Sequence, residues 1–170
     1  WLIVKDPYQT SMFLRLKPIG SDGFPLGSDE LGRDMLSRLI LGTRLSLFMG
    51  IVPVVFAFFI GGAIGIVAGY TGASALTILR VQVLGSVLGP IFVYSTGLIS
   101  VCMILASGLS FLGLGVRPPE PEWGLMLNTL RTAIYTQPWV AALPGLMIFI
   151  TSISFNILAD RLRAAMAIKE

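Results

Sequence analysis

The chain has 170 residues, of which 55% are hydrophobic and only 12% are charged, and its mean hydropathy is +0.84. A soluble domain carries about 25% charged residues, so this composition indicates an integral membrane protein. The chain has no histidine and one cysteine, Cys102, which excludes histidine metal sites, internal disulfides and Ser-His or Cys-His catalytic pairs. The 12 basic and 9 acidic residues that give its net charge of +3 are scattered through the loops, so no basic patch indicates nucleic-acid binding.

Three stretches contain no charged residue: 45–69, 81–116 and 139–159. Crossing a hydrocarbon core of roughly 30 Å takes about 20 residues of α-helix, so each stretch can span a bilayer. Helices are expected because lipid offers no hydrogen-bond partners to the backbone, and residues 54–60 lack the alternation of a barrel strand. We therefore predict an all-α integral membrane protein with transmembrane helices at 45–69, 90–113 and 139–160.

The segment before the first span, 1–44, is predicted to lie outside the membrane. Within it, Ser28 can cap a helix, and Asp34 and Arg38 have the spacing of a favourable i,i+4 ion pair. The apolar residues of 28–44 fall on one helical face. This pattern predicts an amphipathic helix along the membrane interface, and a plain solvated lead-in is the alternative.

The first span ends in Gly61, Gly65 and Gly69, three positions without side chains on one helical face. Another helix can approach closely over such a face, so these glycines are predicted to serve helix packing. A different feature follows the second span, where prolines within 114–138 prevent a long regular element. We predict a connecting loop there.

Three aromatic residues in and after this loop suit the membrane–water interface: Trp123, Tyr135 and Trp139. Their rings combine an apolar body with a polar group, which favours the headgroup level of a bilayer. For the connecting loop as a whole, a dedicated binding surface is the alternative interpretation.

Three motifs then carry a resemblance. Residues 24–40 read FPLGSDELGRDMLSRLI, residues 109–119 read LSFLGLGVRPP, and a third motif runs over 138–160 from Pro-Trp to Asn-Ile-Leu-Ala-Asp. In this order they resemble permeases of the dipeptide/oligopeptide/nickel ABC importers, specifically the second of the two permease subunits. The resemblance covers most of the chain from Phe24 onward.

The resemblance implies part of a type I ABC importer permease, with the second, fifth and sixth of six membrane helices present and the first, third and fourth missing. It also implies a cytoplasmic loop, 70–89, with the later part of the ATPase-coupling loop, and a cytoplasmic tail, 161–170. The implied coupling residues are Gly72, Ala73, Leu76 and Leu79. Their alternative role is simply to begin a membrane helix.

The same resemblance places 1–44 and 114–138 outside a bacterial or archaeal plasma membrane. Those two segments hold eight of the 12 basic residues, so the positive-inside rule alone would favour the opposite orientation. Polar residues of the second and third spans are candidates for lining the pathway, although such side chains often bond to their own or a neighbouring helix. These candidates are Tyr94, Ser95, Thr96, Ser100, Thr151, Ser152 and Asn156.

The implied function is a transmembrane permease subunit of a binding-protein-dependent importer for peptides or a related small solute such as nickel. Implied partners are a homologous permease subunit, two ATPase subunits and an extracytoplasmic solute-binding protein, besides membrane lipid. The chain lacks a Gly-x-x-x-x-Gly-Lys-Ser/Thr loop, so ATP would be hydrolysed on a separate subunit. We expect no catalytic residue, metal or cofactor.

Two other interpretations stay open from the sequence. One is a non-transporting membrane scaffold or decayed permease fragment, which would bind a sister permease through its glycine face. The other is a small stand-alone channel or carrier, which the absence of charged residues within the spans disfavours.

Overall fold

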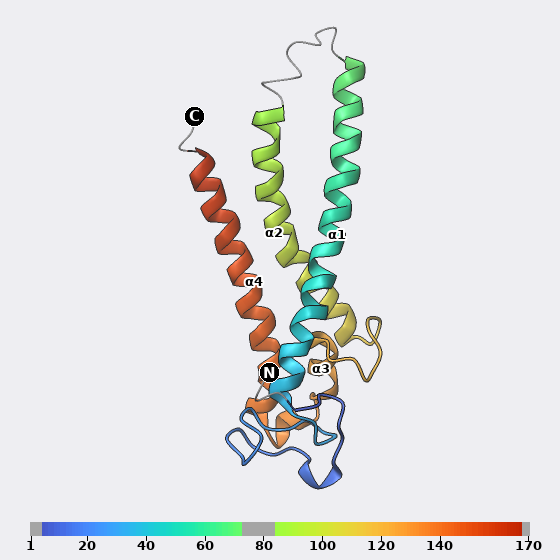
Figure 1. The fold of residues 1–170 in the computed structure, drawn as a ribbon, viewed down its shortest axis with the longest axis vertical. Helices are drawn as coiled ribbons and strands as arrows, with labels where there is room; N and C mark the ends of the chain where they lie inside the picture. Colours follow the sequence, from blue (N-terminus) through green and yellow to red (C-terminus); the bar gives the residue numbers. More distant parts are fainter. Residues whose placement is uncertain (1–4, 73–83, 168–170) are drawn as a thin grey trace.

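The computed structural model describes residues 5–72 and 84–167, without the side chains of 66, 68–72, 84–90 and 167. Three long helices dominate this part of the chain (Figure 1), and none of its residues lies in a named strand. The long helices are α1 (Met35–Gly72), α2 (Leu84–Phe111) and α4 (Pro138–Ala167). The short elements are η1 (Met12–Leu14), α3 (Trp123–Thr129) and η3 (Ala133–Tyr135).

All three long helices have the length and apolar composition needed to cross a membrane. The parts that qualify are Met35–Gly65, Ile91–Phe111 and Pro138–Met166. In an apolar stretch of 18 residues within each part, only 11%, 22% and 22% of the residues, in that order, are buried inside the chain. The predicted all-α membrane fold is therefore confirmed, and most of the apolar helix surface faces lipid or another protein.

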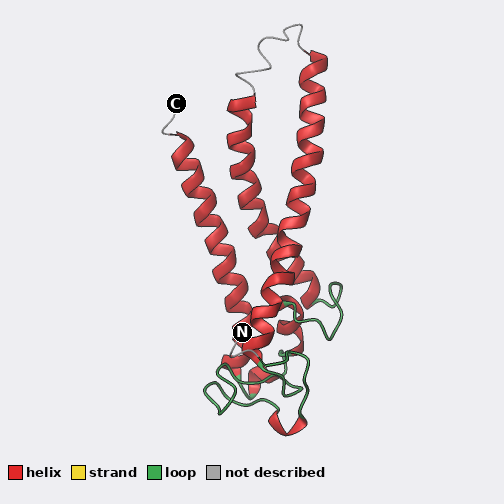
Figure 2. Ribbon diagram, viewed as in Figure 1, coloured by secondary structure: helices red, strands yellow, loops and turns green. Residues whose placement is uncertain are grey.

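The three long helices come together at the end that carries the loops and separate toward the other end (Figures 1 and 2). Helix α2 packs against both α1 and α4, and α3 fills the angle between α2 and α4. The buried core lies at this shared end, where Met35, Met103 and Trp123 are 0% exposed. The fold is thus anchored at its loop-bearing end.

The predicted helix over 28–44 is wrong in its start, because α1 begins only at Met35. Gly27 and Gly32 adopt φ values of +80° and +72°, which a right-handed helix cannot contain. From Met35 onward the helix continues without a break to Gly72, about 57 Å at 1.5 Å per residue. Between residues 5 and 34 the one helical element is η1, so no separate α-helix precedes α1 in this segment.

The cap of α1 also differs from the prediction. Ser28 is fully buried, and its hydroxyl donates to the Leu14 carbonyl and accepts from the Lys17 N–H at 2.8 Å. The capping role falls to Asp34, whose Oδ2 accepts from the Ser37 N–H at 2.9 Å and from the Ser37 hydroxyl. Because the Asp34 carboxylate caps the helix in this way, it does not form the predicted ion pair with Arg38.

The region predicted as a connecting loop contains a helix, α3. Its N-cap is Glu122, whose two carboxylate oxygens accept from the Gly124 N–H at 2.9 Å and the Leu125 N–H at 2.8 Å. The expected interfacial position is wrong for Trp123, which is 0% exposed and donates from Nε1 to the Leu39 carbonyl at 3.1 Å. Its N–H has a partner inside the chain, so the ring is buried as core.

The other two aromatic residues expected at the interface are exposed, Tyr135 at 91% and Trp139 at 76%. Their rings project from η3 and the first turn of α4, outside the core. An interfacial position remains a prediction for both of them.

Candidate functional site

The first family-like motif folds into a buried, charged loop at the start of α1. Arg33 donates from Nε to Asp29 Oδ2 at 2.7 Å and from its backbone N–H to Asp29 Oδ1 at 2.9 Å. Oδ1 also accepts from the Leu31 N–H at 2.8 Å. Since Asp29 and Arg33 are only 4% and 6% exposed, their pairing and these hydrogen bonds offset part of the cost of burying the two charges.

A second arginine, Arg38, connects this loop to two distant segments. Its Nη1 donates to the Pro7 carbonyl at 3.3 Å and to the Pro119 carbonyl at 3.4 Å. Its Nε lies 3.6 Å from Asp29 Oδ2, which is an ion-pair distance without a hydrogen bond. Arg38 therefore holds the N-terminal segment, α1 and the loop before α3 in one arrangement.

The loop before α3 presses directly on α1 at Gly42. A Cβ at this position would overlap the Pro121 carbonyl oxygen and lie 3.1 Å from Trp123 Cδ1. Similar close approaches occur at Gly50, beside Met103 of α2, and at Gly124, beside Ser107 of α2. At each of these three glycines, a segment remote in the sequence approaches a helix closely.

The predicted packing glycines behave differently. At Gly61 and Gly65, a Cβ would meet nothing within 4 Å. Gly69 lies in α1, but its surroundings fall outside the described residues. Close packing over these three positions therefore stays a prediction, and its partner would have to come from outside the described part of this chain.

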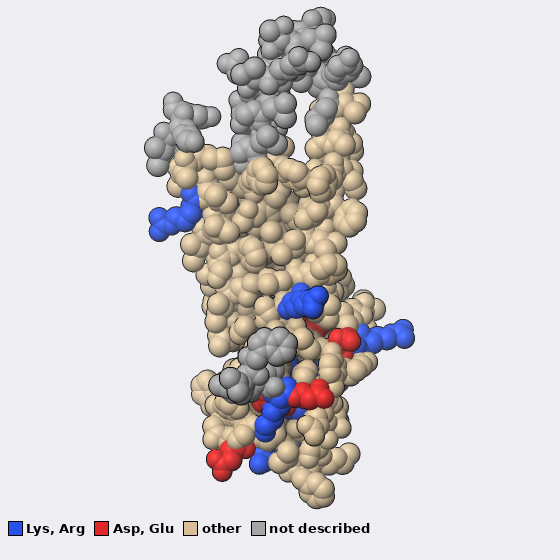
Figure 3. Space-filling view, viewed as in Figure 1, with Lys and Arg blue, Asp and Glu red and all other residues tan. Residues whose placement is uncertain are grey.

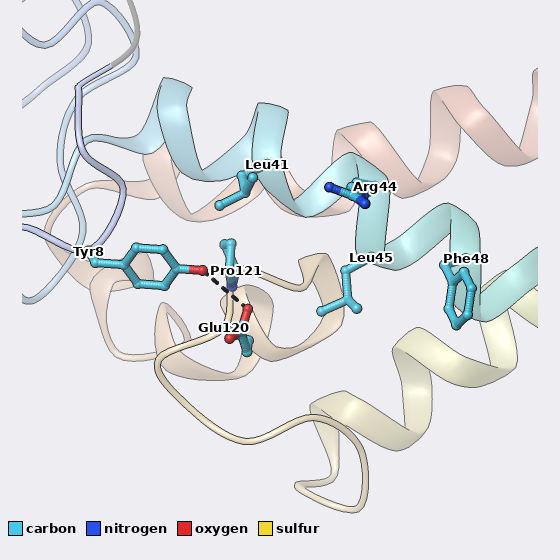
Figure 4. Close-up of a pocket in the computed structure, with 7 residues that line it drawn as sticks. All are labelled: Tyr8, Leu41, Arg44, Leu45, Phe48, Glu120 and Pro121. Carbon is cyan, nitrogen blue, oxygen red and sulfur yellow. Dashed lines mark hydrogen bonds between the residues drawn. The ribbon is translucent and has the colours of Figure 1, made fainter.

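A pocket of about 290 Å³ lies where the start of α1 meets the loop before α3 (Figure 4). On its loop side, Tyr8 donates from its hydroxyl to Glu120 Oε2 at 3.2 Å. Partial burial and then the Glu120 carboxylate raise the pKa of Tyr8, so the phenol stays protonated at neutral pH. The pocket is lined by Tyr8, Leu41, Arg44, Leu45, Phe48, Glu120 and Pro121.

Three of the candidate pathway residues come together between α2 and α4. The Ser100 and Ser152 hydroxyls lie 2.5 Å apart, and Ser100 also contacts the Ser152 carbonyl at 3.2 Å. Asn156 donates from Nδ2 to Ser100 Oγ at 3.2 Å. Ser100 and Ser152 are 1% and 6% exposed, so this cluster joins two membrane helices inside the apolar region.

The other pathway candidates do not join this cluster. Thr96 donates to the Phe92 carbonyl and Thr151 to the Met147 carbonyl, each at 2.8 Å within its own helix. Ser95 is half-buried on α2, and Tyr94 is 67% exposed. Pathway lining stays a prediction for all seven candidates, which are Tyr94, Ser95, Thr96, Ser100, Thr151, Ser152 and Asn156.

Of the expected ATPase-coupling residues the structure describes one, Gly72, at the end of α1 that lies away from α3 (Figure 1). Gly72 is the last residue of α1. Ala73, Leu76 and Leu79 lie outside the described residues. Their role stays a prediction.

Sequence reasoning did not predict that the charged residues Asp29, Arg33, Arg38 and Glu122 are buried. The available signal was the spacing of the motif at 27–34, in which two glycines enclose a short run of acidic residues before an arginine. Such glycines favour a tight folded loop over a helix, and a tight loop can enclose a charge pair.

Three apolar helices anchored by a buried polar loop region define a multi-pass integral membrane protein. No family model matches the chain. It is 30% identical to the di/tripeptide transport system permease protein DppC of Pseudomonas aeruginosa, over 98% of this chain and 80% of that protein. It is also 30% identical to the glutathione transport system permease protein GsiD of Pectobacterium atrosepticum, with the same coverage.

A third relative, the glutathione transport system permease protein GsiD of Escherichia coli O1:K1, is 32% identical over 82% of this chain and 70% of that protein. The chain therefore belongs to the family of ABC-importer permease subunits that includes the DppC and GsiD proteins. It is a transmembrane permease subunit of the cell membrane, as the resemblance of its three motifs predicted.

Proposed function

We propose that this chain helps to move short peptides, including di- and tripeptides and glutathione, into the cell, and that it is not itself an enzyme. The observation that carries the proposal is the match of 98% of the chain to permease proteins of di/tripeptide and glutathione systems. Glutathione is itself a tripeptide, so one substrate chemistry covers both relatives. A related small solute such as nickel is the other substrate to be tested.

The chain would act with a homologous permease subunit, two ATPase subunits and an extracytoplasmic solute-binding protein. Support comes from its surface, because large apolar side chains such as Phe56, Phe59 and Phe149 are more than 60% exposed along the membrane helices. Three helices with so little mutual burial do not enclose a pathway, so further membrane helices would complete it. Alternating access would then follow from rocking of these helices when ATP binds to the partner.

The loop-bearing end would face outward and the other end would face the cytoplasm. The last turn of α1, the first turn of α2 and the last turn of α4 all lie at the end opposite α3 (Figure 1), so one orientation serves all three helices. In this orientation Gly72, Ala73, Leu76 and Leu79 would contact an ATPase. The exposed Met12 and Phe13 of η1, 86% and 99% exposed, would face the solute-binding protein.

The relatives contain residues that this chain lacks within the matched region. The match to DppC extends over 244 positions and includes 98% of the 170 residues of this chain, so at least 74 of those positions (244 − 170) have no counterpart here. We propose that the difference includes membrane helices absent near residues 70–72, where α1 ends. An even number of missing helices would leave the remaining ones in the family orientation.

The test is uptake by proteoliposomes that contain the chain with the sister permease, the ATPases and the binding protein. We expect ATP-dependent accumulation of a labelled dipeptide, with competition by tripeptides and glutathione. Uptake of nickel without peptide would contradict the proposed substrate. A stable complex without any uptake would favour the non-transporting scaffold.

The coupling assignment has its own test in the same vesicles. Leu76→Asp should abolish uptake and substrate-stimulated ATP hydrolysis, since a charge would not fit an apolar contact with the ATPase. Ser74→Ala serves as the control and should leave both unchanged. Unaltered transport by the Leu76 variant would contradict the assignment.

A further inference from the structure

The pocket between Arg44 and Glu120 has one wall made by a single face of α1. Leu41, Arg44, Leu45 and Phe48 stand at i, i+3, i+4 and i+7, which places them together on the helix. The other wall is the loop before α3. Because this loop presses on α1 at Gly42, the wall position is fixed by backbone packing.

This pocket lies at the loop-bearing end, where charged side chains gather beside a surface of the helices that shows none on the face drawn (Figure 3). Arg44 is the last charged residue before the charge-free stretch that begins at Leu45. Leu41 is 37% exposed and Phe48 is 63% exposed, so the apolar wall continues onto open helix surface. An arginine at this level places its guanidinium among lipid headgroups while its stem stays on the apolar side.

The pocket also carries two opposite charges that do not neutralise each other. The described residues include no carboxylate within 4.0 Å of the Arg44 guanidinium. Across the pocket, Glu120 is held through Oε2 by the Tyr8 hydroxyl, which leaves Oε1 available. Figure 4 shows the Arg44 side chain beside α1 and the Glu120 carboxylate on the loop side.

We propose that this pocket binds the headgroup of a phosphatidylethanolamine molecule from the outward-facing leaflet. The lipid phosphate would accept charge-assisted hydrogen bonds from Arg44, and the ammonium would donate to Glu120. One acyl chain would lie along Leu45 and Phe48 into the membrane. A separated cation and anion beside an apolar wall match a zwitterionic lipid better than an anionic one.

The amine of this lipid is the basis for its selection. A primary ammonium can donate a hydrogen bond to Glu120 Oε1, whereas the quaternary ammonium of phosphatidylcholine has no N–H. Phosphatidylglycerol has no positive charge for Glu120 at all. Arg44 should therefore contribute to the binding of any phospholipid, and Glu120 should give the preference for phosphatidylethanolamine.

The test is native mass spectrometry of the full chain, extracted with its copurifying subunits, stripped of lipid and returned to defined lipids. We expect phosphatidylethanolamine to bind about tenfold more tightly than phosphatidylcholine, the size of one charge-assisted hydrogen bond. Arg44→Gln should weaken binding of both lipids about tenfold. Glu120→Gln should remove only the preference between them, and Arg131→Gln, an exposed arginine outside the pocket, should change neither.

Equal binding of the two lipids by the wild-type chain would overturn the proposal, as would unchanged binding by Arg44→Gln. Soluble O-phosphoethanolamine is a further arm, and displacement of the lipid at equal concentration would assign the site to a free headgroup compound. A photoreactive residue in place of Phe48 shows whether lipid or another protein subunit occupies the pocket. Crosslinking to a protein subunit instead of lipid would also overturn the proposal. Glu120 is exposed, so Glu120→Gln should fold and keeps the test decisive.

Discussion

The close approach at Gly42 makes a sharp prediction about the stability of the loop-bearing end. In Gly42→Ala, the new methyl group would overlap the Pro121 carbonyl and crowd the Trp123 ring. The carbonyl belongs to backbone, so relief requires the whole loop before α3 to move. That movement would also stretch the hydrogen bond from Trp123 Nε1 to the Leu39 carbonyl, which is 3.1 Å long.

Three terms set the size of the effect. Overpacking a well-filled site costs about 1–3 kcal/mol, and a lost hydrogen bond costs about 1 kcal/mol. Replacing a helical glycine by alanine returns about 1 kcal/mol. The free energy of unfolding should therefore fall by about 2 kcal/mol, which for a chain of this size lowers Tm by about 4–8 °C.

The assay is thermal unfolding of the purified chain in detergent, followed by tryptophan fluorescence. Gly62→Ala is the matched control, because it lies in the same helix and a Cβ there would meet nothing within 4 Å. The control should show equal or higher stability than the wild type. If both variants unfold at the same temperature, the close contact at Gly42 does not determine the packing of the loop.

Three further variants test other contacts. Arg33→Gln should lower the free energy of unfolding by about 3–5 kcal/mol, because it leaves the buried Asp29 carboxylate without its main partner. Arg38→Gln should lower it less, because Arg38 has no hydrogen bond to Asp29. Equal losses of stability in denaturant titrations would contradict this ranking. Asn156→Ala should weaken α2–α4 packing by about 0.6–1.7 kcal/mol, whereas Ser154→Ala, whose hydroxyl bonds only within α4, should be neutral in the same titration. Phe13→Ser should lower affinity for the solute-binding protein without changing Tm, since its ring is 99% exposed; unchanged affinity by surface plasmon resonance would exclude η1 from that contact.

The membrane helices could be predicted because lipid imposes a local requirement. Each span must satisfy its own backbone hydrogen bonds and present apolar side chains over about 20 residues. Consecutive residues meet that requirement, as in 45–69. A span can therefore be recognised without knowing which segments pack against it. The family motifs added the class of protein, since 24–40 and 109–119 are specific in order and spacing.

The loop-bearing end could not be predicted in the same way. Ser28 has the residue type of a helix cap, and Trp123 has that of an interfacial residue. Both are instead buried, because segments far apart in the chain meet there: Ser28 bonds to Leu14 and Lys17, and Trp123 bonds to Leu39. Local preference was overruled by long-range packing.

The sequence by itself determined that this protein is an integral membrane protein and which transport family it resembles. It also predicted the three membrane-spanning helices that the described residues contain. The tertiary structure alone decided which polar residues are joined, for example Ser100 with Ser152, 52 positions apart, and where α1 meets the loop before α3. The physical reason is the separation along the chain of the residues that interact. Transfer into lipid acts on each segment separately, whereas a buried charge pair, a hydroxyl cluster or a glycine contact exists only when two remote segments come within a few ångströms of each other.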